Sequence, residues 1–225
     1  MDKTILNLKS LKEQVYDYLR EQLRLGALEP GSPINTVETA AKLGVSRTPL
    51  RDALIQLETE DFVSILPRRG VVVRPLTLRE IKEYYQIIGT LESLAVLVSF
   101  DRIDRVGIEE MRRAVAEMKS ALEDDDFDRY YRINLRFHDA YLEPCGNRKL
   151  IRIVNTLKSR LYDFPRQREF VKEWELRSIQ EHERFVELLA EGRSREAAEF
   201  VRDVHWSYDV QEPYIRRYYR NAPEA

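Results

Sequence analysis

The stretch AKLGVSRTPLRDAL, residues 41–54, decides the fold of the N-terminal part of this chain. Gly44 permits a sharp turn, because a residue without Cβ adopts positive φ angles at little cost. Ser46 can cap the helix that follows, and Pro49 falls in its first turn, where a missing amide hydrogen costs little. The inward stripe of that helix is formed by Leu50, Ala53, Leu54 and Leu57. The stretch therefore predicts the end of one helix, a sharp turn and a second helix.

The residues before this stretch supply the rest of a helix-turn-helix. Apolar residues share one face over residues 11–25, which predicts a first helix. A tight turn at residues 28–31 follows, and Thr36 or Thr39 can cap a short helix that runs to about Leu43. In such a motif the start of the third helix enters the major groove of DNA, where arginine can contact guanine edges or phosphates. The side chains at that start are Ser46, Arg47, Thr48 and Arg51.

A two-stranded hairpin is expected next, over residues 62–66 and 71–73. Its tip is basic, since Arg68, Arg69 and Arg74 occur between residues 64 and 75 without any acidic residue. Such a patch suits phosphates and would form the wing of a winged helix-turn-helix. The alternative at this point is a protein-interaction module that has the same fold and does not bind DNA.

Composition limits the function classes. With 37 Lys and Arg against 39 Asp and Glu, the chain has no global positive field, so any DNA-binding surface must be local. The longest apolar stretches fall far short of the roughly 20 residues that a membrane span needs. The N-terminus lacks the apolar core of a signal peptide, and we expect a cytoplasmic protein. The single cysteine, Cys145, cannot form an internal disulfide.

The pattern changes near Pro75, where glycine and proline punctuation gives way to long helical periodicity. From Leu76 to Arg220 the apolar spacing is interrupted at five places, near residues 104–107, 124–126, 144–146, 164–168 and 192–194. We therefore expect a mainly α protein: a winged helix-turn-helix over residues 1–75 and an antiparallel bundle of about six to seven helices over residues 76–225.

All three histidines lie in the helical half, at positions 138, 182 and 205, each on a different predicted helix. Three converging imidazoles could hold a divalent cation and leave a position open for water or a ligand. The alternative is that each histidine is separately hydrogen-bonded or exposed. Such a centre could also activate water in an enzyme, but the chain has no glycine-rich phosphate loop, nucleophile elbow or HExxH motif.

The residues quoted above, with Pro67-Arg68-Arg69-Gly70 after them, resemble the GntR family of bacterial transcription regulators. The helical remainder resembles the FCD-type ligand-sensing domain of the FadR-like branch. The resemblance implies a homodimer that binds pseudo-palindromic operator DNA, usually as a repressor released by a small-molecule effector. The operator contacts would come from Arg47, Thr48 and Arg51 and, in the wing, from Arg69 and Gly70. Relatives often carry a DNA-contacting arginine where this chain has Val37.

The resemblance also implies a metal site built from one aspartate and three histidines. The histidines correspond to His138, His182 and His205, but the aspartate position is Asn134, so the site has lost a negative charge. Zinc is the first expectation, with nickel, iron and manganese as alternatives. Asp209, four residues after His205, is either a support for that imidazole or a solvated surface residue.

An effector-binding arginine of the family is replaced by Ile88. Arg160, where many relatives also have arginine, is either the effector contact instead or an exposed arginine without that role. The effector would be an organic acid or a related metabolite, and the two replacements favour a more apolar or neutral one.

Overall fold

The computed structural model describes residues 9–162, 171–220 and 222–224. Its contacts divide the chain into two compact units. The first comprises residues 1–76 together with residues 159–166, and the second comprises residues 77–158 and 167–225. The fold is mainly α with one small sheet, as the sequence predicts.

The N-terminal unit contains the helices α1 (Leu11–Arg24), α2 (Thr36–Leu43) and α3 (Arg47–Thr59). Gly44 ends α2 in the left-handed conformation, with φ 64°, and so provides the sharp turn before α3. The cap of α2 differs from the expectation of Thr36 or Thr39. Asn35 precedes the helix, and its side chain accepts a hydrogen bond from the backbone N–H of Glu38.

The wing is a three-stranded antiparallel sheet with strand order β1-β3-β2. The strands are β1 (Pro33–Ile34), β2 (Val63–Leu66) and β3 (Gly70–Val73), and Val63 pairs with Val73 while Leu66 pairs with Gly70. The hairpin confirms the prediction, but β1 was not expected. Its two residues pair with Val71 and Val72, which is too short a contact to leave an alternating pattern in the sequence.

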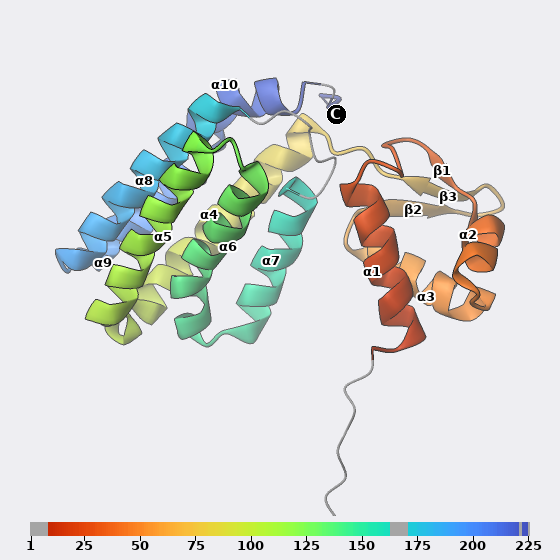
Figure 1. The fold of residues 1–225 in the computed structure, drawn as a ribbon, viewed down its shortest axis with the longest axis horizontal. Coiled ribbons are helices and arrows are strands. Elements are labelled where there is room, and N and C mark those ends of the chain that lie inside the picture. Colours follow the sequence, from red (N-terminus) through yellow and green to blue (C-terminus); the bar gives the residue numbers. More distant parts are fainter. Residues whose placement is uncertain (1–8, 163–170, 221, 225) are drawn as a thin grey trace, which may run out of the picture. The chain divides into compact units, whose positions relative to one another are not determined.

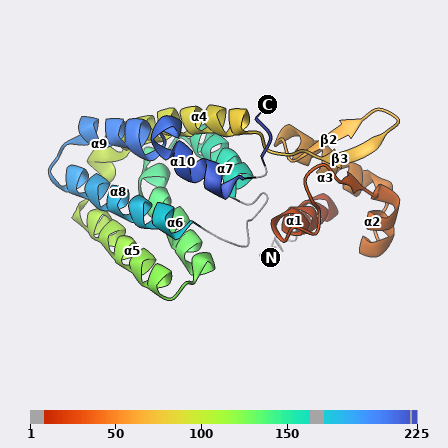
Figure 2. The same cartoon turned by 90° about the horizontal axis from the view of Figure 1, so that it is seen from above.

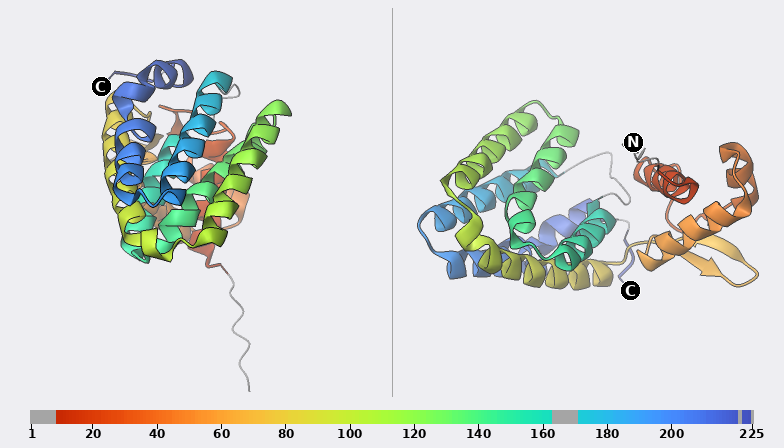
Figure 3. Two further views of the ribbon diagram at one scale, coloured as in Figure 1. Left: turned by 90° about the vertical axis from the view of Figure 1, so that its left-hand side faces the viewer. Right: turned by 90° about the horizontal axis from the view of Figure 1, so that it is seen from below.

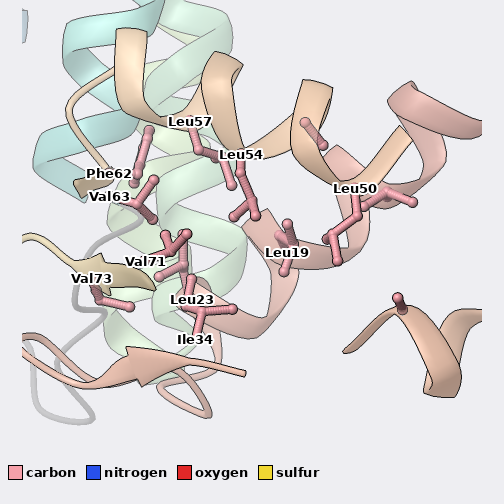
Figure 4. Close-up of a cluster of buried hydrophobic side chains, with 13 residues drawn as sticks. Leu19, Leu23, Ile34, Leu50, Leu54, Leu57, Phe62, Val63, Val71 and Val73 are labelled. Atoms are coloured by element: carbon pink, nitrogen blue, oxygen red, sulfur yellow. The ribbon is translucent and has the colours of Figure 1, made fainter. Parts of the chain in front are cut away.

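One hydrophobic cluster holds this unit together (Figure 4). Leucines on one face of α1 and α3, Leu19 and Leu54 among them, point toward Val71 and Val73 of the sheet. Leu57, Phe62 and Val63 have no exposed surface. The core fixes the back of α3 and leaves its opposite face for solvent.

The C-terminal unit is a helical bundle (Figures 1 and 2). Its helices are α4 (Leu78–Ser99), α5 (Arg105–Glu123), α6 (Phe127–Leu142), α7 (Arg148–Tyr162), α8 (Lys172–Ala190), α9 (Ser194–Phe200) and α10 (Tyr208–Tyr218). The last residues of α7, from Ser159 on, are counted with the first unit. The π-helical segment η3 (Val201–His205) continues α9. Short 3-10 turns follow α4 (Phe100–Arg102) and α6 (Glu143–Cys145).

Within the bundle, α5 packs along α6 and α8, and α4 packs against α6, α9 and η3 (Figure 3). Thr77, Asp104 and Asp126 cap the starts of α4, α5 and α6 with their side chains. The break expected at residues 164–168 lies outside the described residues. None of the described helices is both long and apolar enough to span a membrane.

Candidate functional site

The start of α3 presents polar side chains that no other described residue of its unit contacts by a hydrogen bond or an ion pair. Arg47, Thr48 and Arg51 are exposed. Ser46 is the N-cap residue, but its side chain makes no capping hydrogen bond, and no acidic residue stands in the first turn of the helix. The helix dipole and the unused N–H groups at this end favour a negatively charged ligand.

The wing tip is a second exposed basic element. Residues 66–70 are all exposed, and the backbone N–H of Arg69 bonds to the carbonyl of Leu66 at 3.0 Å. Arg68 has φ 61°, a conformation that costs a residue with a Cβ about 1–2 kcal/mol. Gly70, with φ 91°, has no Cβ and accommodates its positive φ without this strain.

The basic side chains of these two elements carry unneutralised charge. Across the described residues, no ion pair forms with Arg47, Arg51, Arg68 or Arg69. Arg74, by contrast, pairs with Asp61. Unpaired guanidinium groups at a helix start and a hairpin tip are local positive charges of the kind that suits phosphates, on a chain that is almost neutral as a whole. Val37, in the first turn of α2, is 64% exposed and offers only methyl groups.

The three histidines converge within the bundle. His138 comes from α6, His182 from α8 and His205 from η3. One ligand nitrogen from each lies within 4.8 Å of the others, and His138 and His182 are buried. The three predicted helices do therefore bring these side chains together.

Two carboxylates contact the outer nitrogens of these rings. Nδ1 of His138 lies 3.1 Å from Oε2 of Glu92, and Nδ1 of His205 lies 2.9 Å from Oε2 of Glu181. Glu92 is fully buried and also receives hydrogen bonds from the hydroxyl of Tyr141 at 2.5 Å and Nε1 of Trp206 at 2.7 Å.

The electrostatics around Glu92 favour neutral histidines and an ionised carboxylate. Burial raises the pKa of Glu92, but the ion pair with Lys158 and the contact with His138 outweigh it and hold this pKa well below its usual range. Burial, with the charge of Lys158, lowers the pKa of His138 to about 4. Burial also lowers the pKa of His182 well below its usual value. Neutral imidazole is the form that binds metal ions.

Several buried polar atoms of α6 and α8 have no hydrogen-bond partner among the described residues: Nε2 of His138, both ring nitrogens of His182 and Oδ1 of Asn134. Asn134 stands one turn before His138 on α6 and is 6% exposed. Unpaired buried polar atoms are costly, so these atoms require an explanation. Three imidazole nitrogens with an amide oxygen fit a borderline divalent ion such as zinc, although the amide is a weaker ligand than a carboxylate.

The structure contradicts one sequence expectation, that of Asp209. Asp209 does not support His205, because η3 ends in a turn at residues 206–207 and Asp209 is exposed and paired with Lys82. Glu181 takes this role. Arg160 is buried in the N-terminal unit, where Nη2 donates to the carbonyl of Arg74 and the guanidinium lies 5.3 Å from the ring centre of Phe62.

The α7 residue at the histidine centre is Lys158, which sequence reasoning missed together with Glu92 and Glu181. No spacing rule links Glu92 to His138, because they lie 46 positions apart. Glu181 could have been noticed, since it directly precedes His182.

Comparisons with known proteins agree with both halves of the chain. The model of the bacterial regulatory proteins of the gntR family matches residues 11–73, and the FCD domain model matches residues 83–204. The chain belongs to the GntR family, with an FCD sensing domain. A GntR regulator with these domains is a DNA-binding transcription regulator. FCD domains often bind a metal ion, and the three histidines of this one could form such a site.

Relatives of this GntR regulator are similar over most of its length. It is 28% identical over 200 residues to the uncharacterized HTH-type transcriptional regulator YdhC of Bacillus subtilis, which covers 88% of each chain. It is 30% identical over 152 residues to the regulator McbR of Escherichia coli, covering 68% of this chain and 69% of McbR. A gluconate operon transcriptional repressor of Bacillus licheniformis is 25% identical over 201 residues, covering 85% of this chain and 79% of the repressor.

The fold of this GntR regulator is also found in a solved structure of Escherichia coli McbR/YncC. That structure has a TM-score of 0.69 at 23% identity and covers 95% of this chain and 99% of the other.

Proposed function

We propose that this GntR regulator is a repressor whose two copies bind an operator with the start of α3 and the tip of the wing. The observation that carries the proposal is the set of exposed arginines at these two places, for which the described residues provide no ion pair. The direct contacts are assigned to Ser46, Arg47, Thr48, Arg51, Arg68, Arg69 and Gly70. One of the relatives is a gluconate operon transcriptional repressor, which supports repression rather than activation of transcription.

Alanine substitutions test these contacts. Arg47→Ala should lower operator affinity by about 1–3 kcal/mol and relax the preference for one base if the arginine reads a guanine edge. Arg69→Ala should weaken binding to all duplexes. The slope of log affinity against log salt concentration should become smaller by the amount that corresponds to about one phosphate contact. Arg112→Ala, an exposed arginine on α5, is the control and should leave binding unchanged. If both the wing variant and the helix variant kept the affinity of the wild type, the alternative of a protein-interaction module that does not bind DNA would be favoured instead.

The second part of the proposal is a divalent metal, zinc first, held by His138, His182, His205 and Asn134. When bound, the metal would supply a Lewis-acidic position for an oxygen of the effector. Nickel, iron and manganese suit the same nitrogen ligands to different degrees. Elemental analysis of the purified chain before and after chelation is the direct test. His182→Ala should abolish near-stoichiometric metal, whereas Asn134→Asp should raise metal affinity because it adds a charged ligand.

We further propose that an organic acid or a related metabolite binds in the helical unit and shifts operator affinity. A ligand that favours one state of the protein changes the affinity of the other site by its differential free energy, typically about 1–3 kcal/mol. Charged groups at this centre include Lys158 and the two carboxylates, and Arg177 pairs with Glu181 beside it. Arg160, the contact expected from the sequence, donates from Nη2 to the carbonyl of Arg74. The chain would act as a sensor without turnover, and candidate acids incubated with the metal-loaded protein should remain unchanged.

We propose that the chain forms a homodimer through the outer face of α4. Four apolar side chains on this face are 44–46% exposed: Ile87, Leu94, Leu97 and Val98. At helical spacing they form one stripe, and a stripe of this kind is suited to a two-fold contact with the same stripe of a second copy. Two copies match an operator with two half-sites. Binding to chromosomal operators would place the protein in the cytoplasm.

A further inference from the structure

The proposed metal site raises the question of which nitrogen each histidine turns toward the ion. A neutral imidazole carries its hydrogen on one nitrogen and a lone pair on the other, and the partner of the protonated nitrogen decides which is which. We infer that Glu92 and Glu181 are positioning residues that hold His138 and His205 in the same tautomer. In this tautomer the hydrogen is on Nδ1 and the lone pair of Nε2 faces the centre. The inference rests on the proposed metal site.

The donors around Glu92 determine the tautomer of His138. The Lys158 ammonium and the Trp206 indole can only donate, so both use the carboxylate as an acceptor. The Tyr141 hydroxyl donates its hydrogen to Oε2 of the same carboxylate, so its oxygen can only accept from a further partner. Nδ1 of His138 then faces two acceptors, Oε2 of Glu92 at 3.1 Å and the oxygen of Tyr141 at 2.5 Å. The ring can satisfy this contact only with a hydrogen on Nδ1, and its Nε2 is the buried atom without a partner.

The same arrangement occurs around Glu181. Nε of Arg177 donates to Oε1 at 3.0 Å, and Nε2 of Gln211 donates to both oxygens, at 3.0 and 3.2 Å. Nδ1 of His205 lies 2.9 Å from Oε2. A carboxylate surrounded by donors is an acceptor for the ring as well, so the hydrogen of His205 is on Nδ1. Carboxylates that orient a ligand histidine in this way commonly tune metal affinity.

His182 differs from the other two. Both of its nitrogens are buried without a hydrogen-bond partner among the described residues, and its ring packs on Phe137 with centroids 4.2 Å apart. Packing restrains the plane of the ring and leaves its tautomer open. The centre therefore consists of two rings whose tautomer is set before metal binding and one ring whose tautomer the metal selects.

The test uses the full-length chain, labelled with nitrogen-15 and freed of metal. Long-range proton–nitrogen correlation spectra report directly which ring nitrogen is protonated. The inference predicts protonated Nδ1 and unprotonated Nε2 for both His138 and His205. Protonated Nε2 in either ring would overturn it for that residue. This readout needs no metal: if the predicted tautomers are found and the chain binds no zinc, the metal proposal fails and the carboxylate-set tautomers stand.

Zinc titration of variants supplies the second readout. Glu181→Gln and Glu92→Gln keep the size of the side chain and should each weaken zinc binding by about 10–100-fold. Glu187→Gln, at an exposed acid on the same helix as Glu181, should bind like the wild type. Glu181 lies closer to the surface than Glu92, so its variant decides the matter if Glu92→Gln does not fold. Wild-type zinc affinity of a folded Glu181→Gln variant would contradict the positioning role.

Discussion

Nε1 of Trp206 donates a 2.7 Å hydrogen bond to Oε2 of Glu92, a residue 114 positions earlier in the chain. Gly89, three residues before Glu92 on α4, makes this contact sterically feasible. A Cβ at Gly89 would lie 2.9 Å from the Cβ of Trp206 and 3.5 Å from the backbone of Arg202. The π-helical turn that carries His205 thus lies directly on α4 at a position where only glycine fits.

Gly89→Ala should therefore push η3 away from α4. We expect the free energy of unfolding to fall by about 1–3 kcal/mol, as for overpacked cores, and zinc affinity to fall with it because His205 moves. Urea denaturation and zinc titration measure the two effects. Gly107→Ala is the matched control: its Cβ would meet atoms only at 3.5 Å and beyond, and alanine favours the helix. Equal stability of the two variants would contradict the close packing of α4 and η3.

The strained backbone of Arg68 predicts a trade between stability and DNA binding. Arg68→Gly removes the strain of φ 61° and should leave the protein as stable as the wild type or up to about 1 kcal/mol more stable. The same change removes a positive charge from the wing and should weaken operator binding. Arg68→Lys keeps the charge and the strain, and should retain most of the affinity. A glycine variant that binds operator like the wild type would show that Arg68 does not contact DNA.

The apolar stripe on α4 predicts the assembly state. Leu94→Glu places a charge at the centre of the proposed two-fold contact, so the variant should be a monomer in analytical ultracentrifugation at concentrations where the wild type is a dimer. Val106→Glu is the control, because Val106 is equally apolar and 61% exposed but lies at the start of α5. Dimers of both variants would place the interface elsewhere.

Glu175, on α8, predicts a specific pH dependence of stability. Burial raises its pKa to about 7, against the lowering effect of a hydrogen bond with Tyr130. Glu175 therefore keeps its proton in the folded protein up to about pH 7, whereas in the unfolded chain it loses the proton near pH 4.5. The contribution of this group to the free energy of unfolding is fully present below pH 4.5 and is lost as the pH rises through about 7. Glu175→Gln should therefore gain about 1–2 kcal/mol relative to the wild type between pH 5 and 8.

Chemical denaturation across this pH range measures the effect. Glu187→Gln, which changes an exposed acid on the same helix, should run parallel to the wild type. Parallel curves for Glu175→Gln as well would show that Glu175 titrates normally in the folded protein.

Sequence patterns predict the winged helix and the helical bundle because the signals for their helices and turns are local. Gly44, the apolar stripe of α3 and the interruptions between helices each act within a few residues. The features that the sequence does not predict also have physical reasons. The cap of α2 falls on Asn35 because helix starts shift by one residue without changing the pattern. The π-helical turn before Trp206 breaks the helix that sequence periodicity would continue, and so separates Asp209 from His205.

The convergence of the three histidines was predictable from the sequence, and the residues around them were not. His138, His182 and His205 are the chain's only histidines, and each stands on its own helix, so convergence could be anticipated. Glu92 and Lys158 are ordinary members of helical patterns, and only tertiary packing joins them. A buried ion pair leaves no signature in spacing, because its members come from α4 and α7.

Operator recognition through α3 and the wing is the function that we propose for this chain. Fluorescence anisotropy of the full-length protein with labelled DNA from its own promoter, at several salt concentrations, tests this most directly. We expect a site-specific complex that loses affinity as salt rises and that is much weaker for Arg47→Ala. Equal affinity for the promoter and for a scrambled duplex of the same length, in the wild type, would contradict it.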